Sequence, residues 1–158
     1  MLKFAFYKAP GTATDKLIRL ASGSRFSHVE FCMGASCISA SCISASKRDG
    51  AQVREKQIIF RPGHWDFVTV SGNFAAAQRY ARSQLGQPYN TAGAIASIFP
   101  TRFDVGHGLF CSEFTALICI AGGRHIAAPH TLTPGEFYQQ LFRRPRGHKP
   151  RESNSAIA

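Results

Sequence analysis

Cys111 begins a segment whose residue types suit a nucleophile at the start of a helix. Apolar residues recur there at helical spacing, which predicts one buried helix face: Phe110, Phe114, Leu117, Ile118 and Ala121. Gly122-Gly123 ends the segment. At a helix start, unpaired N–H groups and the positive end of the helix dipole favour a thiolate, the nucleophilic form of cysteine. The alternative is a small buried cysteine on a core helix.

A cysteine nucleophile needs a base from another part of the fold, and His28 is our candidate. Residues 27–33 are predicted to form a strand in which His28 and Glu30 share one face. Val29 and Phe31 take the other face. Glu30 lies roughly 6.6 Å further along the strand, where a carboxylate can accept the imidazole N–H and stabilise the imidazolium. A solvent-facing or salt-bridged glutamate is the alternative interpretation.

Other polar residues have weaker claims on this chemistry. Glu113 lies two residues past Cys111, so on a helix it points away from the thiol, and we interpret it as a structural ion-pair partner. Tyr89 is a candidate donor near the oxyanion, the alternative being a core or hinge tyrosine. The remaining histidines lie near glycines, prolines or loops, and we interpret them as surface residues: His64, His107, His125, His130 and His148. Among them, His107 is close in sequence to Cys111.

Five cysteines, an odd number in a chain of 158 residues, argue against a disulfide framework. Cys32, Cys37 and Cys42 are spaced by five residues, which matches no common zinc pattern. On extended backbone Cys37 would point away from the other two. We therefore expect neither a metal nor another cofactor.

The net charge of +10 favours anionic partners such as wall polymers or acidic surfaces. Simple solubility is the alternative role for this charge. Residues 143–158 hold five of the basic residues and are broken by prolines, so we expect a disordered basic tail able to contact anionic polymers. No motif of interleaved aromatic and basic residues accompanies the charge, so nucleic acid is not an expected partner.

The elements that must position Cys111 and His28 follow a strands-first order that predicts an α+β fold. We expect one domain over residues 1–142, built on a twisted antiparallel sheet of about five strands with the Cys111 helix packed on it. Apolar and turn residues predict strands at 2–7, 27–33, 52–60 and 65–70, and helices ending at Gly23, Leu85, Phe99, Ala121 and Phe142. No apolar run is long enough for a membrane span. The first residues resemble no signal peptide, so we expect synthesis in the cytoplasm.

Residues 36–45 contain an exact tandem repeat, Ser-Cys-Ile-Ser-Ala followed at once by the same five residues. Because five is odd, two extended copies would present opposite faces of the chain, and only one copy can fill a given place in a sheet. We expect the extra copy to lengthen a hairpin loop. The sequence leaves open which copy pairs in register.

Three motifs together resemble the NlpC-type papain-like cell-wall peptidases. They are Leu85-Gly86-Gln87-Pro88-Tyr89, Phe110-Cys111-Ser112-Glu113-Phe114, and Ser27-His28-Val29 followed by a short apolar strand. Here the histidine precedes the cysteine, which resembles the circularly permuted branch, the YiiX-like amidases. The segment from Ser44 to Gly50 is similar to phage-borne members of that branch. The resemblance covers residues 1–142 and implies a permuted papain-like fold.

The resemblance implies a cysteine amidase or peptidase that uses Cys111 and His28, with the backbone N–H of Cys111 donating to the oxyanion. Amide bonds in peptidoglycan stem peptides are the implied substrate, reached by release of the protein or by carriage on a phage particle. The family's third catalytic position falls on Ser44, or on Ser39 in the other register; our candidate for that role is Glu30, with Ser44 as the alternative. Permuted relatives also include thioesterases and lipid acyltransferases. A phage structural module that keeps the fold without the activity is the remaining alternative.

Overall fold

The computed structural model of the chain describes residues 1–99 and 105–142 and shows a mixed α+β arrangement, as the order of elements predicted. Five antiparallel strands form one sheet in the order β4-β3-β2-β1-β5. Their bounds are Leu2–Tyr7 (β1), His28–Cys32 (β2), Ser39–Ser46 (β3), Gln52–Ile59 (β4) and Trp65–Val70 (β5). The expected sheet of about five antiparallel strands is confirmed. The predicted tail, residues 143–158, lies outside the described residues.

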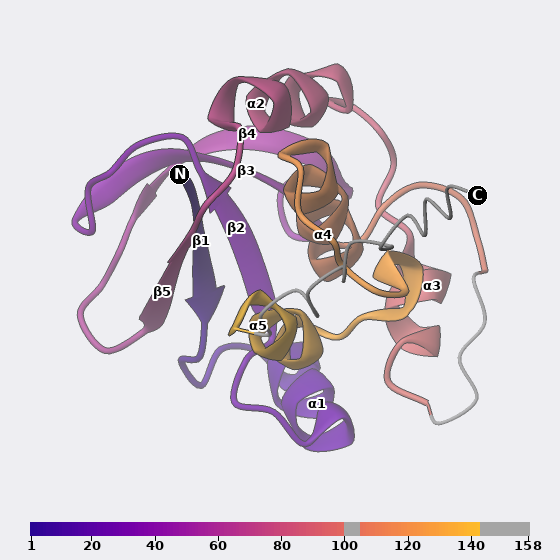
Figure 1. Cartoon of the computed structure of the whole chain (residues 1–158). Helices are drawn as coiled ribbons and strands as arrows, with labels where there is room; N and C mark the ends of the chain where they lie inside the picture. The colour runs from indigo at the N-terminus through magenta and orange to yellow at the C-terminus, as the bar shows by residue number, and fades with distance from the viewer. Residues whose placement is uncertain (100–104, 143–158) are drawn as a thin grey trace, which may run out of the picture.

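Helices α2 (Phe74–Ser83), α4 (Cys111–Ala121) and α5 (Pro134–Phe142) cover one face of the sheet (Figure 1). The other helices are α1 (Ala13–Ser22), α3 (Thr91–Ala96) and a short 3₁₀ helix, η1 (Pro129–Thr131). Helix α4 packs against β2, β3, α2 and α5. Among residues 1–99 and 105–142, no helix has the length and apolarity needed to cross a membrane.

The main core lies between the sheet and the helices and explains why α4 sits where it does. Phe4 and Phe31 from the strands and Phe114 and Phe137 from α4 and α5 are fully buried in it. The rings of Phe4 and Phe137 meet edge to face at 5.3 Å.

The prediction of a single buried face was wrong, because α4 is buried on nearly all sides: Ser112 and Thr115 are buried as well as Phe114. Leu117 and Ala121, which the apolar spacing assigned to the buried face, are only partly buried. The packing of α4 on β2 and β3 brings its first residue near the start of β2.

The opposite face of the sheet carries the even-numbered side chains of β2 and β3. Cys32 and Cys42 are cross-strand partners there and belong to a second, smaller apolar cluster with Ala5, Ala40 and Phe60. Cys37 is exposed in the loop before β3. His28 and Glu30 extend from the same face of β2 as Cys32, as the alternation of the strand predicted.

The second copy of the tandem repeat, residues 41–45, is the one in register with β2. Ile43 pairs with Phe31 and is fully buried. Its counterpart in the first copy, Ile38, is 78% exposed in the loop before β3. Ser36 accepts hydrogen bonds from the N–H groups of Ile38 and Ser39, so the first copy forms the turn and only the beginning of β3. The extra copy therefore lengthens the hairpin loop, as expected.

Helix α2 is shorter than the sequence predicted and ends at Ser83 rather than Leu85. The reason lies in the next residues, which leave the helix to join the edge of β4. The N–H of Gly86 donates to Val53, and the N–H of Val53 donates to Gln87. Helix α3 also ends early, at Ala96 rather than Phe99. The early end of α2 leaves Gly86 and Gln87, which precede Tyr89, paired with β4.

Candidate active site

Cys111 is the first residue of α4 and is 6% exposed. Two side chains hold this end of the helix: Ser112 donates to the carbonyl of Leu132 at 2.6 Å, and Thr115, one turn further on, donates to the carbonyl of Cys111 at 2.8 Å. The N–H of Cys111 is among the first four of the helix, which have no partner within it. The residue therefore combines a sheltered sulfur with nearby backbone donors.

The loop before Cys111 is tied to the segment that carries Tyr89. The N–H of Leu109 donates to Pro88 at 3.0 Å, and the N–H of Asn90 donates to Leu109 at the same distance. Gly108 has a φ of +95°, and a Cβ atom at that position would lie 2.0 Å from the Pro88 carbonyl oxygen. Only glycine permits this approach. Tyr89 and Cys111, 22 residues apart, thus line one cleft.

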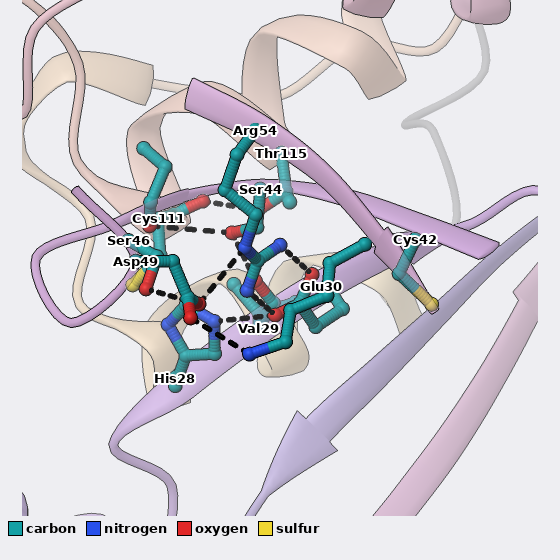
Figure 2. A network of polar contacts seen from close by, with 12 residues as sticks. His28, Val29, Glu30, Cys42, Ser44, Ser46, Asp49, Arg54, Cys111 and Thr115 are labelled. Atoms are coloured by element: carbon teal, nitrogen blue, oxygen red, sulfur yellow. Dashed lines mark hydrogen bonds and ion pairs between the residues drawn. The ribbon is translucent and has the colours of Figure 1, made fainter. Parts of the chain in front are cut away.

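His28 is the first residue of β2, and its imidazole lies between Cys111 and Glu30 (Figure 2). Its Nε2 atom is 2.8 Å from Oε1 of Glu30. The opposite edge of the ring, with Nδ1, is turned toward Cys111, whose side chain acts electrostatically on the imidazole. Two distant segments, one at the head of a helix and one on a strand, are thereby joined through a single imidazole.

The environment of His28 favours the protonated ring. Burial is the largest influence and disfavours the charge, but the negative charge of Cys111 and the hydrogen bond to it, followed by those of Glu30, outweigh burial. Together they raise the pKa of His28 from 6.5 to about 10. The surroundings of the imidazole, with Cys111 on one side and a carboxylate on the other, therefore favour its protonated form.

Glu30 is 1% exposed, so it is not solvent-facing, but it is salt-bridged to Arg54, as the other half of the alternative interpretation held. Both of its oxygens accept hydrogen bonds from Arg54, at 2.8 Å from Nη1 to Oε2 and at 2.6 Å from Nη2 to Oε1. Burial disfavours the charged carboxylate most strongly, but the hydrogen bonds from Arg54 and then His28 overcome it and lower the pKa of Glu30. The carboxylate thus stays charged and contacts His28 and Arg54 together.

Arg54 and Asp49 belong to this network, although the sequence did not single them out. Nε of Arg54 donates to Asp49 at 3.0 Å, and Asp49 also accepts from Lys56 at 2.7 Å and from Ser46 at 2.9 Å. Arg54 lies on β4, two strands from Glu30. The one available signal was that a buried glutamate requires a cation, but the sequence does not identify which one.

Ser44, the alternative third residue, lies on the same strand face but is engaged elsewhere. Its hydroxyl is fully buried and donates to the carbonyl oxygen of Val29 at 2.7 Å. Ser39, the candidate of the other register, stands at the start of β3 opposite Ile59. The side chain that the structure brings to the imidazole is that of Glu30.

Tyr89 supplies a phenol beside Cys111. Burial, then the charge of Cys111, raises its pKa, so the hydroxyl keeps its proton and can donate a hydrogen bond. The cleft that these side chains line has a volume of about 520 Å³, and Ile18, Ile58 and Trp65 also line it. It offers space for a substrate beside Cys111.

The remaining sequence candidates lie apart from Cys111. Glu113 is an ion-pair partner, as interpreted, and its Oε1 atom is 2.7 Å from Nδ1 of His130. His107 and His125 are exposed and His64 is half-buried, while His148 lies outside the described residues. Within residues 1–99 and 105–142, no group of three or more metal-ligating side chains is arranged to hold an ion.

No protein-family model matches this chain, and a search of curated proteins finds no match.

Proposed function

We propose that the protein is a cysteine hydrolase that cleaves an amide bond through an acyl-enzyme. The observation that carries this proposal is the contact of His28 with both Cys111 and Glu30 in a cleft of about 520 Å³. A nucleophile, its base and a group that orients the base are the three parts that such catalysis requires. Glu30 takes the third role in this proposal, in place of Ser44.

In the proposed first stage, the Cys111 sulfur, with its proton on His28, attacks the substrate carbonyl carbon. The oxyanion accepts hydrogen bonds from the backbone N–H of Cys111 and from the hydroxyl of Tyr89. His28 then passes its proton to the leaving nitrogen as the C–N bond breaks. A thioester on Cys111 and a free amine result.

The second stage uses the change of charge at Cys111. Formation of the thioester removes the negative charge that contributes most to raising the pKa of His28. The imidazole can then act as a base, taking a proton from water while the hydroxide attacks the thioester. The carboxylic acid product leaves, and Cys111 returns with its proton on His28. Glu30 holds the ring in both stages.

Amide bonds in peptidoglycan stem peptides are the proposed substrate, on the resemblance to the permuted NlpC-type amidases. The basic surface of the chain, with a net charge of +10, suits an anionic wall because long-range attraction raises the encounter rate. We propose that the protein reaches the wall after release or on a phage particle. We also propose that its fold is a permuted papain-like fold.

A thioesterase or lipid acyltransferase is the second candidate. It is favoured by the apolar side chains of Ile18, Ile58 and Trp65, which line the cleft that holds Cys111. Such a wall suits an acyl chain as well as it suits the apolar part of a peptide. The chemistry at Cys111 and His28 is the same for both substrates.

The test is incubation of purified peptidoglycan with the protein and with Cys111→Ser, followed by comparison of the masses of the soluble products. Hydrolysis of an amide by the wild-type protein alone supports the proposal. A matched incubation with a fatty-acyl ester or thioester tests the second candidate. Hydrolysis of the acyl substrate with no change in peptidoglycan would replace the first function by the second, and no reaction with either would contradict both.

A further inference from the structure

We propose that Arg54 is a positioning residue for the candidate catalytic histidine and acts by holding the Glu30 carboxylate against His28. The inference deepens the proposed function and rests on it, since it assigns a role within the same site. It comes from contacts that neither the family resemblance nor the sequence pattern contained.

The contact between Arg54 and Glu30 has the geometry of a fixed pair. Two nitrogens of the guanidinium meet the two carboxylate oxygens at 2.6 and 2.8 Å. The Arg54 side chain is 10% exposed and that of Glu30 is 1% exposed. A bidentate contact of this kind fixes the plane of the carboxylate as well as its position. The same Oε1 atom that meets Arg54 also meets Nε2 of His28, so the guanidinium sets the direction from which the imidazole is held.

Arg54 is itself held at its remaining nitrogen. Nε donates to Asp49, which Lys56 and Ser46 also contact. Figure 2 shows the guanidinium between the carboxylates of Asp49 and Glu30. Ser44 is the cross-strand partner of Arg54 on the strand between β4 and β2. Its short side chain, turned to a main-chain carbonyl, leaves the space that the long arginine crosses.

The charge of Arg54 has a second effect on the site. Glu30 is buried, and a buried carboxylate without a cation tends to take up a proton. Once protonated, it no longer stabilises an imidazolium on His28. Arg54 therefore keeps Glu30 in the form that the proposed mechanism uses. Other titratable and charged groups near this pair are Cys32, Cys42, Arg48, Asp49, Lys56, Tyr89 and Cys111.

The test measures the rate at which iodoacetamide alkylates Cys111 across a range of pH, in the full chain and in single variants. In Arg54→Met we expect the rate at neutral pH to fall about tenfold, the effect of losing one opposite charge near a titrating pair. The pH midpoint of alkylation should move upward. Arg54→Lys keeps the positive charge but loses the two parallel hydrogen bonds to Glu30, so its alkylation rate and pH midpoint should lie between those of the wild type and Arg54→Met. Arg82→Met is the matched control, because Arg82 also pairs with a glutamate, Glu55, but does not line the cleft, so its profile should match the wild type.

A double variant separates positioning through Glu30 from a direct or merely structural role. If Arg54 acts through Glu30, adding Arg54→Met to Glu30→Gln should change the alkylation rate less than about twofold, because the two residues form one unit. The double variant has no uncompensated buried charge, because both partners are neutral. Its alkylation rate therefore remains measurable if Arg54→Met alone fails to fold. A folded Arg54→Met protein with the wild-type rate and pH midpoint would overturn the inference, as would fully additive effects. Alkylation needs no substrate, so failure to cleave peptidoglycan would leave this result standing.

Discussion

Nε2 of His28 lies 2.8 Å from Oε1 of Glu30, two residues further along the same strand. Side chains at this spacing share one face of a strand, and a glutamate is long enough to reach back along it. The pair is thus made within a single five-residue strand, β2. The tertiary structure adds a sulfur on one side of the pair and a guanidinium on the other.

Iodoacetamide at neutral pH should label Cys111 ahead of the other four cysteines. Cys37 is the informative control, because it is exposed whereas Cys111 is 6% exposed. Accessibility alone predicts that Cys37 reacts first, while activation by His28 predicts the reverse. Peptide mapping by mass spectrometry after short exposure gives the order. Equal labelling of the five residues would contradict an activated thiolate.

His28→Ala should slow the alkylation of Cys111 by about tenfold or more, the scale of losing one adjacent opposite charge. The physical reason is that the imidazole holds the proton of the pair. His130→Ala is the matched control, because His130 contacts Glu113 in the same half of the molecule but not His28. An unchanged rate in His28→Ala would separate the imidazole from the reactive sulfur.

Replacing Cys111 should lower the pKa of His28. In the wild-type protein that pKa is raised to about 10, and among the groups that raise it the negative charge of Cys111 contributes most. In Cys111→Ser that charge is absent, so the pKa should move back toward its ordinary 6.5. NMR titration of the His28 ring carbons in the two proteins measures the shift. The same pKa in both would mean that the sulfur carries no charge at the imidazole.

Glu30 should make the stability of the protein depend on pH in the acidic range. Folding lowers the pKa of Glu30 from its ordinary value of 4.5. The contribution of Glu30 to the free energy of unfolding is therefore fully present above pH 4.5 and is lost as the pH falls through the folded-state pKa. Glu30→Gln should therefore flatten the fall of the urea unfolding midpoint below 4.5. At neutral pH the variant should be less stable by about 3 kcal/mol, since it breaks a buried ion pair. An acid dependence identical to the wild type would show that other carboxylates account for it.

Deleting residues 36–40, one copy of the tandem repeat, should give a folded protein. The N–H of Met33 donates to Ser41, so removal of the loop would leave Gly34-Ala35 as a two-residue connection. Glycine at the first position suits a type II′ hairpin turn. We expect native circular dichroism and a Cys111 alkylation rate within about twofold of the wild type, because the loop is remote from the site. Loss of folding would mean that the first copy does more than lengthen the loop.

Local spacing was sufficient to predict several parts of the candidate site. The helical recurrence of apolar residues around Phe114 placed Cys111 at a helix start, and strand alternation placed His28 and Glu30 on one face. Gly23 also marked a helix end correctly. Each of these features depends on residues within a few positions of one another, so the periods of helix and strand are enough to show them.

The tertiary structure alone decided how these parts meet. It selected the second repeat copy for β3, turned the hydroxyl of Ser44 to the backbone, and brought Arg54 across that strand to Glu30. None of these outcomes follows from periodicity, because each depends on strand order and on packing between segments far apart in the chain. A buried carboxylate requires a cation, but only the order β4-β3-β2 determines which arginine is within reach.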